Sequence, residues 1–256
     1  MKFGPGHPLA YPVSVTIGAL VVCLAWAPFG DLDQVAALAT VALGILGYTG
    51  FQLAMALGYL SNGLADIHPR RDTSGSDGGS RFRTNSGTDV SADTGREPED
   101  SPGGRTVEIK RVRQQHRLVS RSWLEITENY RTRWLPVFFE PALLGMTEAE
   151  ADVTDRSVDT ATLHFYPSGK ARTSEPPGRL IDNPSRPDPD APILATDSAR
   201  VRRRLLLDAQ STVAAPFVAL MWVYVAAGGF MAFLAATSVA AATAIWLGAI
   251  RGSDPS

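Results

Sequence analysis

The segments that decide the fold of the middle of this chain are Ser122-Trp-Leu-Glu-Ile-Thr127, Arg133-Trp-Leu-Pro-Val-Phe-Phe139 and Thr162-Leu-His-Phe-Tyr166. In each segment apolar side chains recur at every second position, and aromatic and β-branched residues are frequent. This period of two is typical of β-strands. The sequence therefore predicts a small antiparallel sheet or barrel within residues 106–181. Pro136 cannot donate to a central ladder, so its strand is expected at an edge or beside a bulge.

The composition of the whole chain hides a segregation of polar and apolar residues. Of its 256 residues 45% are hydrophobic and 20% charged, with a net charge of −2. A soluble protein would show similar values, but here the apolar residues are concentrated on either side of the polar middle. The single cysteine, Cys23, excludes a disulfide or a cysteine-based zinc cluster within this chain.

The N-terminal apolar segment predicts a transmembrane hairpin over residues 13–60. Residues 13–29 and 35–60 are apolar runs separated by the acidic turn at residues 30–34. A membrane-spanning helix needs about 20 residues, with about 17 as the lower limit. Ala25-Trp26-Ala27 leaves open a cleaved signal peptide. The weakly charged start, with Lys2 alone, and Pro28 after the cleavage position favour a retained helix.

The C-terminal apolar segment predicts a second transmembrane hairpin over residues 213–250. It contains 38 residues without a charge. One helix of that length would measure about 57 Å, against a bilayer core of about 30 Å. Two spans that reverse at Gly228-Gly229 fit better. The arginine-rich residues 197–212 predict a lead-in helix at the membrane surface.

The expected fold class is therefore a helical membrane protein with four spans, arranged as two hairpins, and an inserted small antiparallel β domain. The other boundaries follow from composition. Residues 1–12 form an N-terminal tail, residues 61–104 a Ser- and Gly-rich disordered linker, residues 105–196 the β domain and residues 251–256 a C-terminal tail.

Lys and Arg residues mark one side of this predicted topology. With four spans they fall on the side of the β domain, whereas the opposite side has only residues 30–34 and the glycine turn. Loops on the cytoplasmic side of a membrane are enriched in Lys and Arg. We therefore expect a multi-pass plasma-membrane protein whose termini and central domain are cytoplasmic.

Basic residues beside the bilayer are expected to bind anionic membrane lipid through its headgroups. The candidate contacts are Lys110, Arg111, Arg113, Arg117, Arg202, Arg203 and Arg204. A solvated strand face explains the first four equally well. Nucleic acid is not an expected partner, because no recognition motif accompanies the charge.

Two further patterns are expected to serve contacts with another membrane protein or a second copy of the chain. Small residues recur every four positions, which lets a helix approach closely, although an Ala- and Gly-rich span also gives such stripes by chance. They are Gly50, Ala54 and Gly58, and Ala236, Ala240, Ala244 and Gly248. Three aromatic residues of the predicted strands are candidates for an exposed partner surface: Trp123, Trp134 and Phe138.

The sequence contains no recognisable catalytic motif. A phosphate-binding loop, a dinucleotide fingerprint and a serine-hydrolase elbow are missing. The acidic run at residues 148–159 lacks the spacing and the glycine of a calcium loop. His164 shares a strand face with Tyr166, and we expect a surface histidine rather than a base. No cofactor, metal or catalytic residue is therefore predicted.

Three short motifs, Arg133-Trp-Leu-Pro-Val137, Tyr166-Pro-Ser-Gly169 and Leu180-Ile-Asp-Asn-Pro184, lie between the apolar hairpins. In them the chain resembles conserved multi-spanning membrane proteins of unknown function from high-GC actinobacteria. The resemblance covers the chain from about residue 105 onward. It implies a bacterial plasma membrane and no particular activity.

Two hypotheses about function remain open. The first is a non-enzymatic accessory or scaffold subunit that presents its β domain to a membrane partner, and it predicts an exposed apolar or aromatic patch. The second is a membrane-surface enzyme or lipid-binding protein that acts on anionic or phosphorylated headgroups. It predicts a pocket beside the basic segment.

Overall fold

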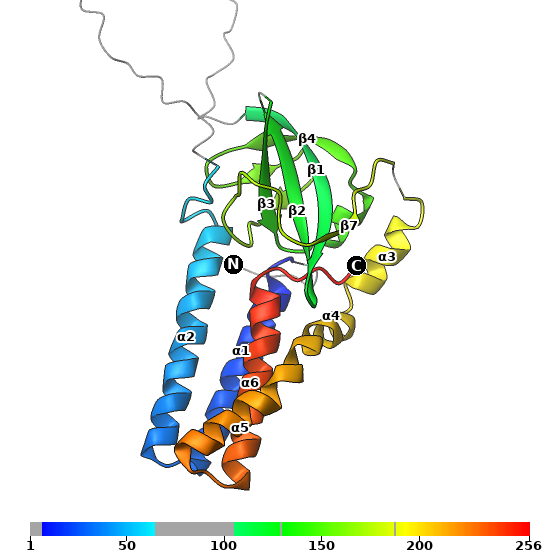
Figure 1. Ribbon diagram of the computed structural model, residues 1–256. Helices are drawn as coiled ribbons and strands as arrows, with labels where there is room; N and C mark the ends of the chain where they lie inside the picture. The colour runs from blue at the N-terminus through cyan, green and yellow to red at the C-terminus, as the bar shows by residue number, and fades with distance from the viewer. Residues whose placement is uncertain (1–6, 65–104, 129, 187) are drawn as a thin grey trace, which may run out of the picture.

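The chain folds into a helical bundle with a curled antiparallel sheet seated on one end (Figure 1). The computed structural model describes residues 7–64, 105–128, 130–186 and 188–256. Most of the predicted linker, residues 65–104, and the start of the predicted N-terminal tail, residues 1–6, lie outside the described residues. The arrangement confirms a helical membrane protein with an inserted β domain.

Within the described residues, the bundle contains four helices that are long and apolar enough to cross a membrane, as the sequence predicts. Their spans are Ala10–Phe29, Leu32–Ala56, Val201–Ala226 and Phe230–Ile250. The first combines α1 (Ala10–Trp26) with the 3-10 turn η1 (Ala27–Phe29), and the second is α2 (Leu32–Ala56). This content is that of an integral membrane protein.

The third span is longer than predicted and includes most of the expected lead-in helix. It runs through α4 (Val201–Asp208), the 3-10 segment η4 (Ala209–Ala214) and α5 (Ala215–Ala226). A separate short helix, α3 (Ala191–Ser198), precedes it. The predicted reversal at Gly228-Gly229 is confirmed, since the fourth span, α6 (Phe230–Ile250), begins directly after it.

The bundle packs around α6, which contacts α1, α2, α4 and α5. Its buried core includes Ala19 and Cys23 of α1, Ile45 of α2, and Trp246 of α6. Trp246 donates its indole N–H to the Thr49 hydroxyl at 3.0 Å. An indole N–H inside a membrane needs such a partner, because no water is available there.

The sheet consists of seven strands in the hydrogen-bonded order β3-β2-β1-β4-β5-β6, with β7 paired to the second half of β1. Their bounds are β1 Arg105–His116, β2 Val119–Glu128, β3 Arg131–Val137, β4 Glu148–Val153, β5 Val158–Asp159, β6 His164–Phe165 and β7 Arg179–Asp182. A 3-10 turn, η3 (Pro141–Gly145), follows β3. The strand that contains Pro136 is the end strand of this order, as expected.

The sheet curls because residues after β6 return to β3. Val137 bridges Pro167, and Trp134 exchanges backbone hydrogen bonds with Arg172 at 2.9 and 2.8 Å. These contacts join the two ends of the strand order. The concave side holds a core that includes Ile109, Leu124 and Leu135, so the predicted alternation is confirmed.

The convex side of β1 and β2 is crossed by residues 173–178. This segment leaves the pairing of Arg172 with Trp134 and reaches β1, where Gln114 donates to the Glu175 carboxylate at 3.3 Å. Gly178 ends the crossing with φ +134°, and a Cβ there would lie 2.4 Å from the Gln115 carbonyl oxygen. The crossing therefore requires a glycine at this position.

Candidate functional site at the junction of sheet and bundle

Three separate parts of the chain fasten the sheet to the membrane helices. At the start of α1, Leu9 packs with Phe138 and with Ala56 of α2. After α2, the Asn62 carbonyl accepts from Ala171 N–H at 2.7 Å, and Leu64 enters the sheet core. Residues 61–64, part of the predicted linker, thus belong to the sheet domain.

The third attachment is the segment after α6, which the sequence predicts only as a tail. It runs along β2 beyond the end of β3, where Ser253 bridges Arg121 and the Asp254 N–H donates to the Ser120 carbonyl at 2.8 Å. Gly252 makes the bend with φ +76°. The segment thereby extends the sheet by a short stretch of backbone pairing.

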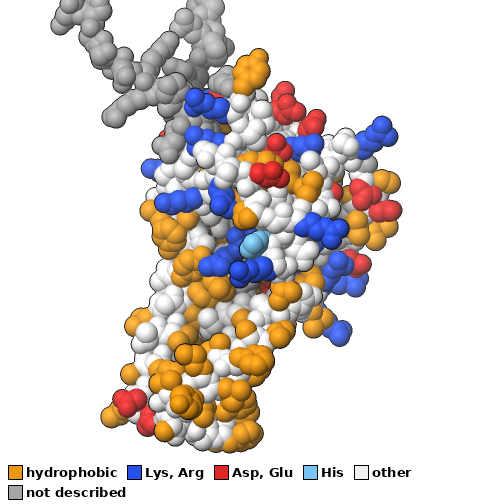
Figure 2. All heavy atoms as spheres, viewed as in Figure 1, with side chains coloured by type: hydrophobic (Ala, Val, Ile, Leu, Met, Phe, Trp, Pro, Cys, Tyr) orange, Lys and Arg blue, Asp and Glu red, His pale blue; other side chains and the backbone are white. Residues whose placement is uncertain are grey.

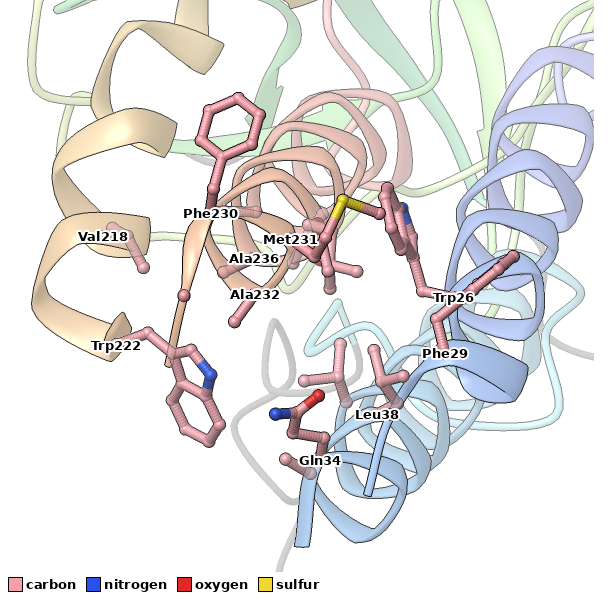
Figure 3. Close-up of a pocket in the computed structure, with 18 of the residues that line it drawn as sticks. Trp26, Phe29, Gln34, Leu38, Val218, Trp222, Phe230, Met231, Ala232 and Ala236 are labelled. Atoms are coloured by element: carbon pink, nitrogen blue, oxygen red, sulfur yellow. The ribbon is translucent and has the colours of Figure 1, made fainter. Parts of the chain in front are cut away.

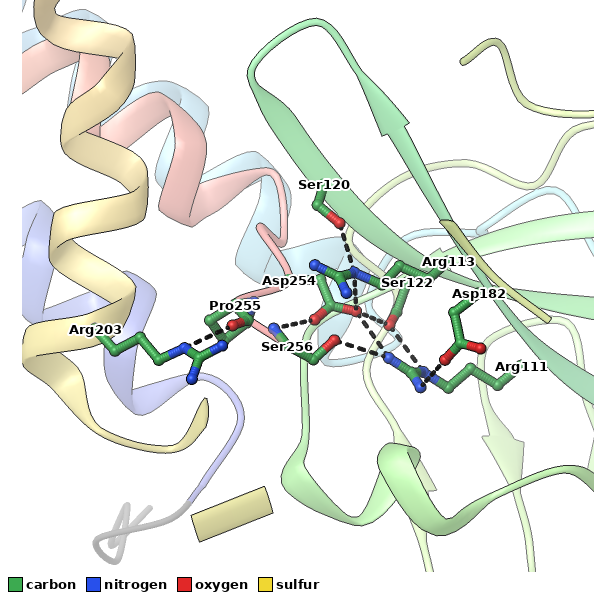
Figure 4. Close-up of polar contacts among 9 residues, drawn as sticks. All are labelled: Arg111, Arg113, Ser120, Ser122, Asp182, Arg203, Asp254, Pro255 and Ser256. Carbon is green, nitrogen blue, oxygen red and sulfur yellow. Dashed lines mark hydrogen bonds and ion pairs between the residues drawn. The ribbon is translucent and has the colours of Figure 1, made fainter. Parts of the chain in front are cut away.

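The Asp254 side chain lies in a closed group of polar residues at the membrane end of the sheet (Figure 4). Its carboxylate is 3.1 Å from Arg111 Nη2 and 4.0 Å from Arg113 Nε, and it accepts a hydrogen bond of 2.5 Å from Ser122 Oγ. Arg111 also contacts Asp182 at 3.3 Å. Both Arg111 and Asp254 are buried, so the pair joins the bundle to the sheet out of contact with water.

The charge of Asp254 is stabilised by this group. Burial alone would raise the pKa of the carboxyl, but the guanidinium of Arg111 and the hydroxyl of Ser122 outweigh it and hold the pKa below its ordinary value. Asp254 therefore carries its negative charge at neutral pH.

This position does not fit the predicted headgroup role of Arg111. The register places Arg111 opposite Leu124, on the core face of the sheet, and its side chain is 1% exposed. Lys110 pairs with Glu148 at 3.6 Å, and Arg113 donates to the Ser120 hydroxyl at 2.8 Å. Arg111 lies two residues after Ile109, so the two side chains share the core face of the strand. This spacing is the sequence signal that could have shown the burial of Arg111.

The three predicted arginines of α4 differ in exposure. Arg202 and Arg203 are exposed, and Arg203 Nε donates to the Pro255 carbonyl at 3.1 Å. Arg204 is buried, with its guanidinium 4.0 Å from the centre of the Tyr11 ring. Among the predicted headgroup contacts, Arg117, Arg202 and Arg203 are therefore the exposed ones.

The three aromatic residues predicted as a partner surface lie on the convex face, but this chain covers two of them. Trp123 is 6% exposed and lies in the part of the face that residues 173–178 cross, and Phe138 is 2% exposed in the contact with Leu9 and Ala56. Trp134 is half-buried. Because Trp123 and Phe138 are buried, they cannot form the exposed partner surface that the sequence predicts.

A cluster that sequence reasoning missed joins the start of α1 to β6. His7 Nε2 is 3.2 Å from the Tyr166 hydroxyl, and the Tyr166 ring packs edge-on against His164 at 4.6 Å. His164 Nδ1 in turn contacts Asp159. Burial raises the pKa of nearby Glu140, although His164 counteracts it. Asp159, His164 and Tyr166 come from β5, β6 and the residues just after β6. Glu140 precedes η3, and His7 comes from outside the sheet.

A cavity of about 740 Å³ lies within the bundle, between α2 on one side and α5 and α6 on the other. Figure 3 shows Trp26, Leu38, Trp222 and Met231 around the open space. Ala236, Ala240 and Ala244 of the predicted small-residue stripe line it, whereas Gly248 packs against Asp208. The three alanines thus widen a cavity, and Gly248 allows the close approach of α4.

Comparisons with protein-family models, with curated proteins and with solved structures find no match to this chain. The resemblance to actinobacterial membrane proteins of unknown function therefore stays a prediction.

Proposed function

We propose that this chain is an accessory or scaffold protein of the bacterial plasma membrane, which holds its sheet domain at the cytoplasmic surface for a membrane partner. The observation that carries the proposal is the buried contact of Asp254 with Arg111, which fastens the sheet to the last span. Together with the attachments at Leu9 and Asn62, it fixes the height and orientation of the sheet above the bilayer. A sheet domain held in a fixed position above the bilayer can present one of its surfaces to a membrane partner.

The distribution of charge supports the cytoplasmic orientation. In the view of Figure 2, Lys and Arg side chains gather on the sheet, among acidic ones, and at its junction with the bundle, whereas the far end of the bundle shows acidic side chains alone. That far end carries Asp31 and Asp33 at the start of α2. Positive charge is retained on the cytoplasmic side of bacterial membranes, so the sheet would face the cytoplasm.

The surface best suited to a partner is β7. In the described part of the chain this strand pairs with β1 alone, and its Leu180 and Ile181 are 49% and 41% exposed. A strand with an unpaired edge and exposed apolar side chains accepts an extended segment of another protein. We therefore transfer the predicted partner surface from Trp123 and Phe138 to Leu180 and Ile181.

Site-specific photo-crosslinking in native membranes tests this role. A photoreactive amino acid replaces Leu180, and the control carries it at Tyr130, which is fully exposed at the opposite end of the sheet. The proposal expects one discrete crosslinked product from position 180 and none of that size from position 130. Equal crosslinking from both positions, or none from either, would contradict a partner at β7.

A second candidate function, binding of an anionic lipid, is favoured by a different observation. It rests on two arginines at the other side of the junction, Arg121 and Arg251, and not on β7.

A further inference from the structure

One face of α6 leads from the cavity towards the sheet. Ala240, Ala244 and Leu247 line the cavity, and Arg251 follows α6 four residues after Leu247. Residues three and four apart share a helix face. Four residues correspond to a rise of about 6 Å, so the Arg251 backbone lies about one turn above the apolar lining.

The matching face of α2 leads to the same place. Gln34, Leu38 and Val41 line the cavity, and Tyr48 lies two turns after Val41 on that face. Arg251 Nε donates to the Tyr48 hydroxyl at 3.4 Å. The helices α2 and α6 that line the cavity are therefore linked, on the side of the cavity next to the sheet, by a polar contact between Tyr48 and Arg251.

A second arginine approaches this polar contact from the sheet. Arg121 of β2 bridges Ser253, two residues after Arg251. Burial lowers the pKa of Arg121, and the charge of Arg251 lowers it further. No ion pair of either arginine with a carboxylate is found among residues 7–64, 105–128, 130–186 and 188–256. Two neighbouring cations without a counter-ion favour an external anion.

We propose that an anionic phospholipid occupies this site, with its phosphate between Arg121 and Arg251 and one acyl chain in the cavity between α2 and α6. The Tyr48 hydroxyl would donate to the same phosphate. The site lies on the side of the junction next to α2, apart from Arg202 and Arg203 of α4.

The combination of charge and apolar volume selects a lipid over other anions. Inorganic phosphate would use the two arginines but leave the cavity of about 740 Å³ without a role. Volumes of about 300–1,000 Å³ are typical of sites that enclose a small ligand. A membrane surface supplies an anionic headgroup at the level of the arginines and a hydrocarbon chain below it. This inference is independent of the scaffold role and of β7.

Native mass spectrometry of the full chain, purified in detergent and titrated with lipid, tests the proposal. The probes are dioleoyl phosphatidylglycerol, dioleoyl phosphatidylcholine with the same chains, and inorganic phosphate. The variants are Arg251→Gln, which removes one cation at an exposed position, and Ala240→Phe, which fills the cavity. Arg202→Gln, an exposed arginine on α4, is the matched control. Thermal unfolding in the same detergent confirms that each variant is folded.

The proposal expects one phosphatidylglycerol to bind wild type and Arg202→Gln equally, and to bind Arg251→Gln about ten-fold more weakly, because a charge-assisted hydrogen bond is lost. Ala240→Phe should weaken binding by a similar factor, and phosphatidylcholine should bind more weakly throughout. Equal binding of the two lipids would overturn the headgroup assignment. Unchanged binding to Ala240→Phe, or full competition by inorganic phosphate, would show a simple anion site and overturn the lipid assignment.

Discussion

Asp254 shows how a single residue in a short segment can hold two parts of a protein together. Its carboxylate contacts Arg111 at 3.1 Å, and neither side chain is more than 1% exposed. Ionised groups in such a place are stable only when they are paired. The charge of this one carboxylate therefore adds a buried ion pair to the backbone pairing that attaches α6 to the sheet.

Replacing Asp254 by Asn should lower the free energy of unfolding by about 3 kcal/mol, because Arg111 would lose its buried partner. Urea-induced unfolding in detergent micelles measures this change. The control is Asp197→Asn, which removes an exposed pair with Arg200 and should cost less than about 0.5 kcal/mol. Similar values for the two variants would contradict a buried attachment.

The contribution of Asp254 should also depend on pH. Because the pKa of Asp254 in the folded chain is below its ordinary value, the stabilisation is present above the ordinary pKa of about 4 and is lost as the pH falls below it. The difference in stability between wild type and Asp254→Asn should therefore be constant from about pH 5 to 7 and decrease in more acidic solution. A difference that grows on acidification would contradict the charged pair.

The strands and helices show which features a local pattern can predict. The alternation around Leu124 and Leu135 predicts the concave core, and uncharged runs of sufficient length predict the spans. These features depend on residues close together in the chain. The burial of Trp123 on the face that residues 173–178 cross, and of Arg111 beside Asp254, depends on segments that are distant in the chain. An exposed aromatic and a covered one have the same local pattern, so the partner surface could not be placed from the sequence.

Gly178 should be essential for the crossing of residues 173–178. In Gly178→Ala the Cβ would meet the Gln115 carbonyl oxygen at 2.4 Å, at a φ of +134°. The variant should lose more than about 1 kcal/mol of stability, and residues 173–178 should be cleaved faster in limited proteolysis. Gly145→Ala is the control, since its Cβ would meet no atom closer than 4.0 Å. Equal cleavage of the two variants would contradict the crossing.

At the contact between sheet and helices, Phe138, the residue after β3, should be important for stability. It is 2% exposed and packs against Leu9 and Ala56. Truncating a buried phenylalanine costs about 3–5 kcal/mol. Phe138→Ala should lower the urea midpoint accordingly, whereas Tyr130→Ala, at a fully exposed position, should leave it unchanged. A midpoint that does not move in Phe138→Ala would contradict the seating of the sheet on α1 and α2.

The whole molecule combines an apolar bundle and a polar sheet whose relative position is fixed. The sequence predicts both parts and their order along the chain, because hydrophobicity and charge are properties of each segment alone. It does not predict the cavity between α2 and α6, since a cavity depends on how helices tilt relative to one another. It does not predict the grouping of Arg121 with Arg251 either, because these residues come from separate elements.

The orientation of the whole chain decides whether the basic junction can meet the cytoplasmic leaflet. Labelling of single cysteines with a membrane-impermeant maleimide measures it, in a Cys23→Ala background that removes the native buried thiol. Leu32→Cys, at a site 89% exposed at the far end of the bundle, and Tyr130→Cys on the sheet report the two sides. We expect Leu32→Cys to be labelled in intact cells and Tyr130→Cys only after permeabilisation. Labelling of Tyr130→Cys in intact cells would contradict the cytoplasmic placement of the sheet.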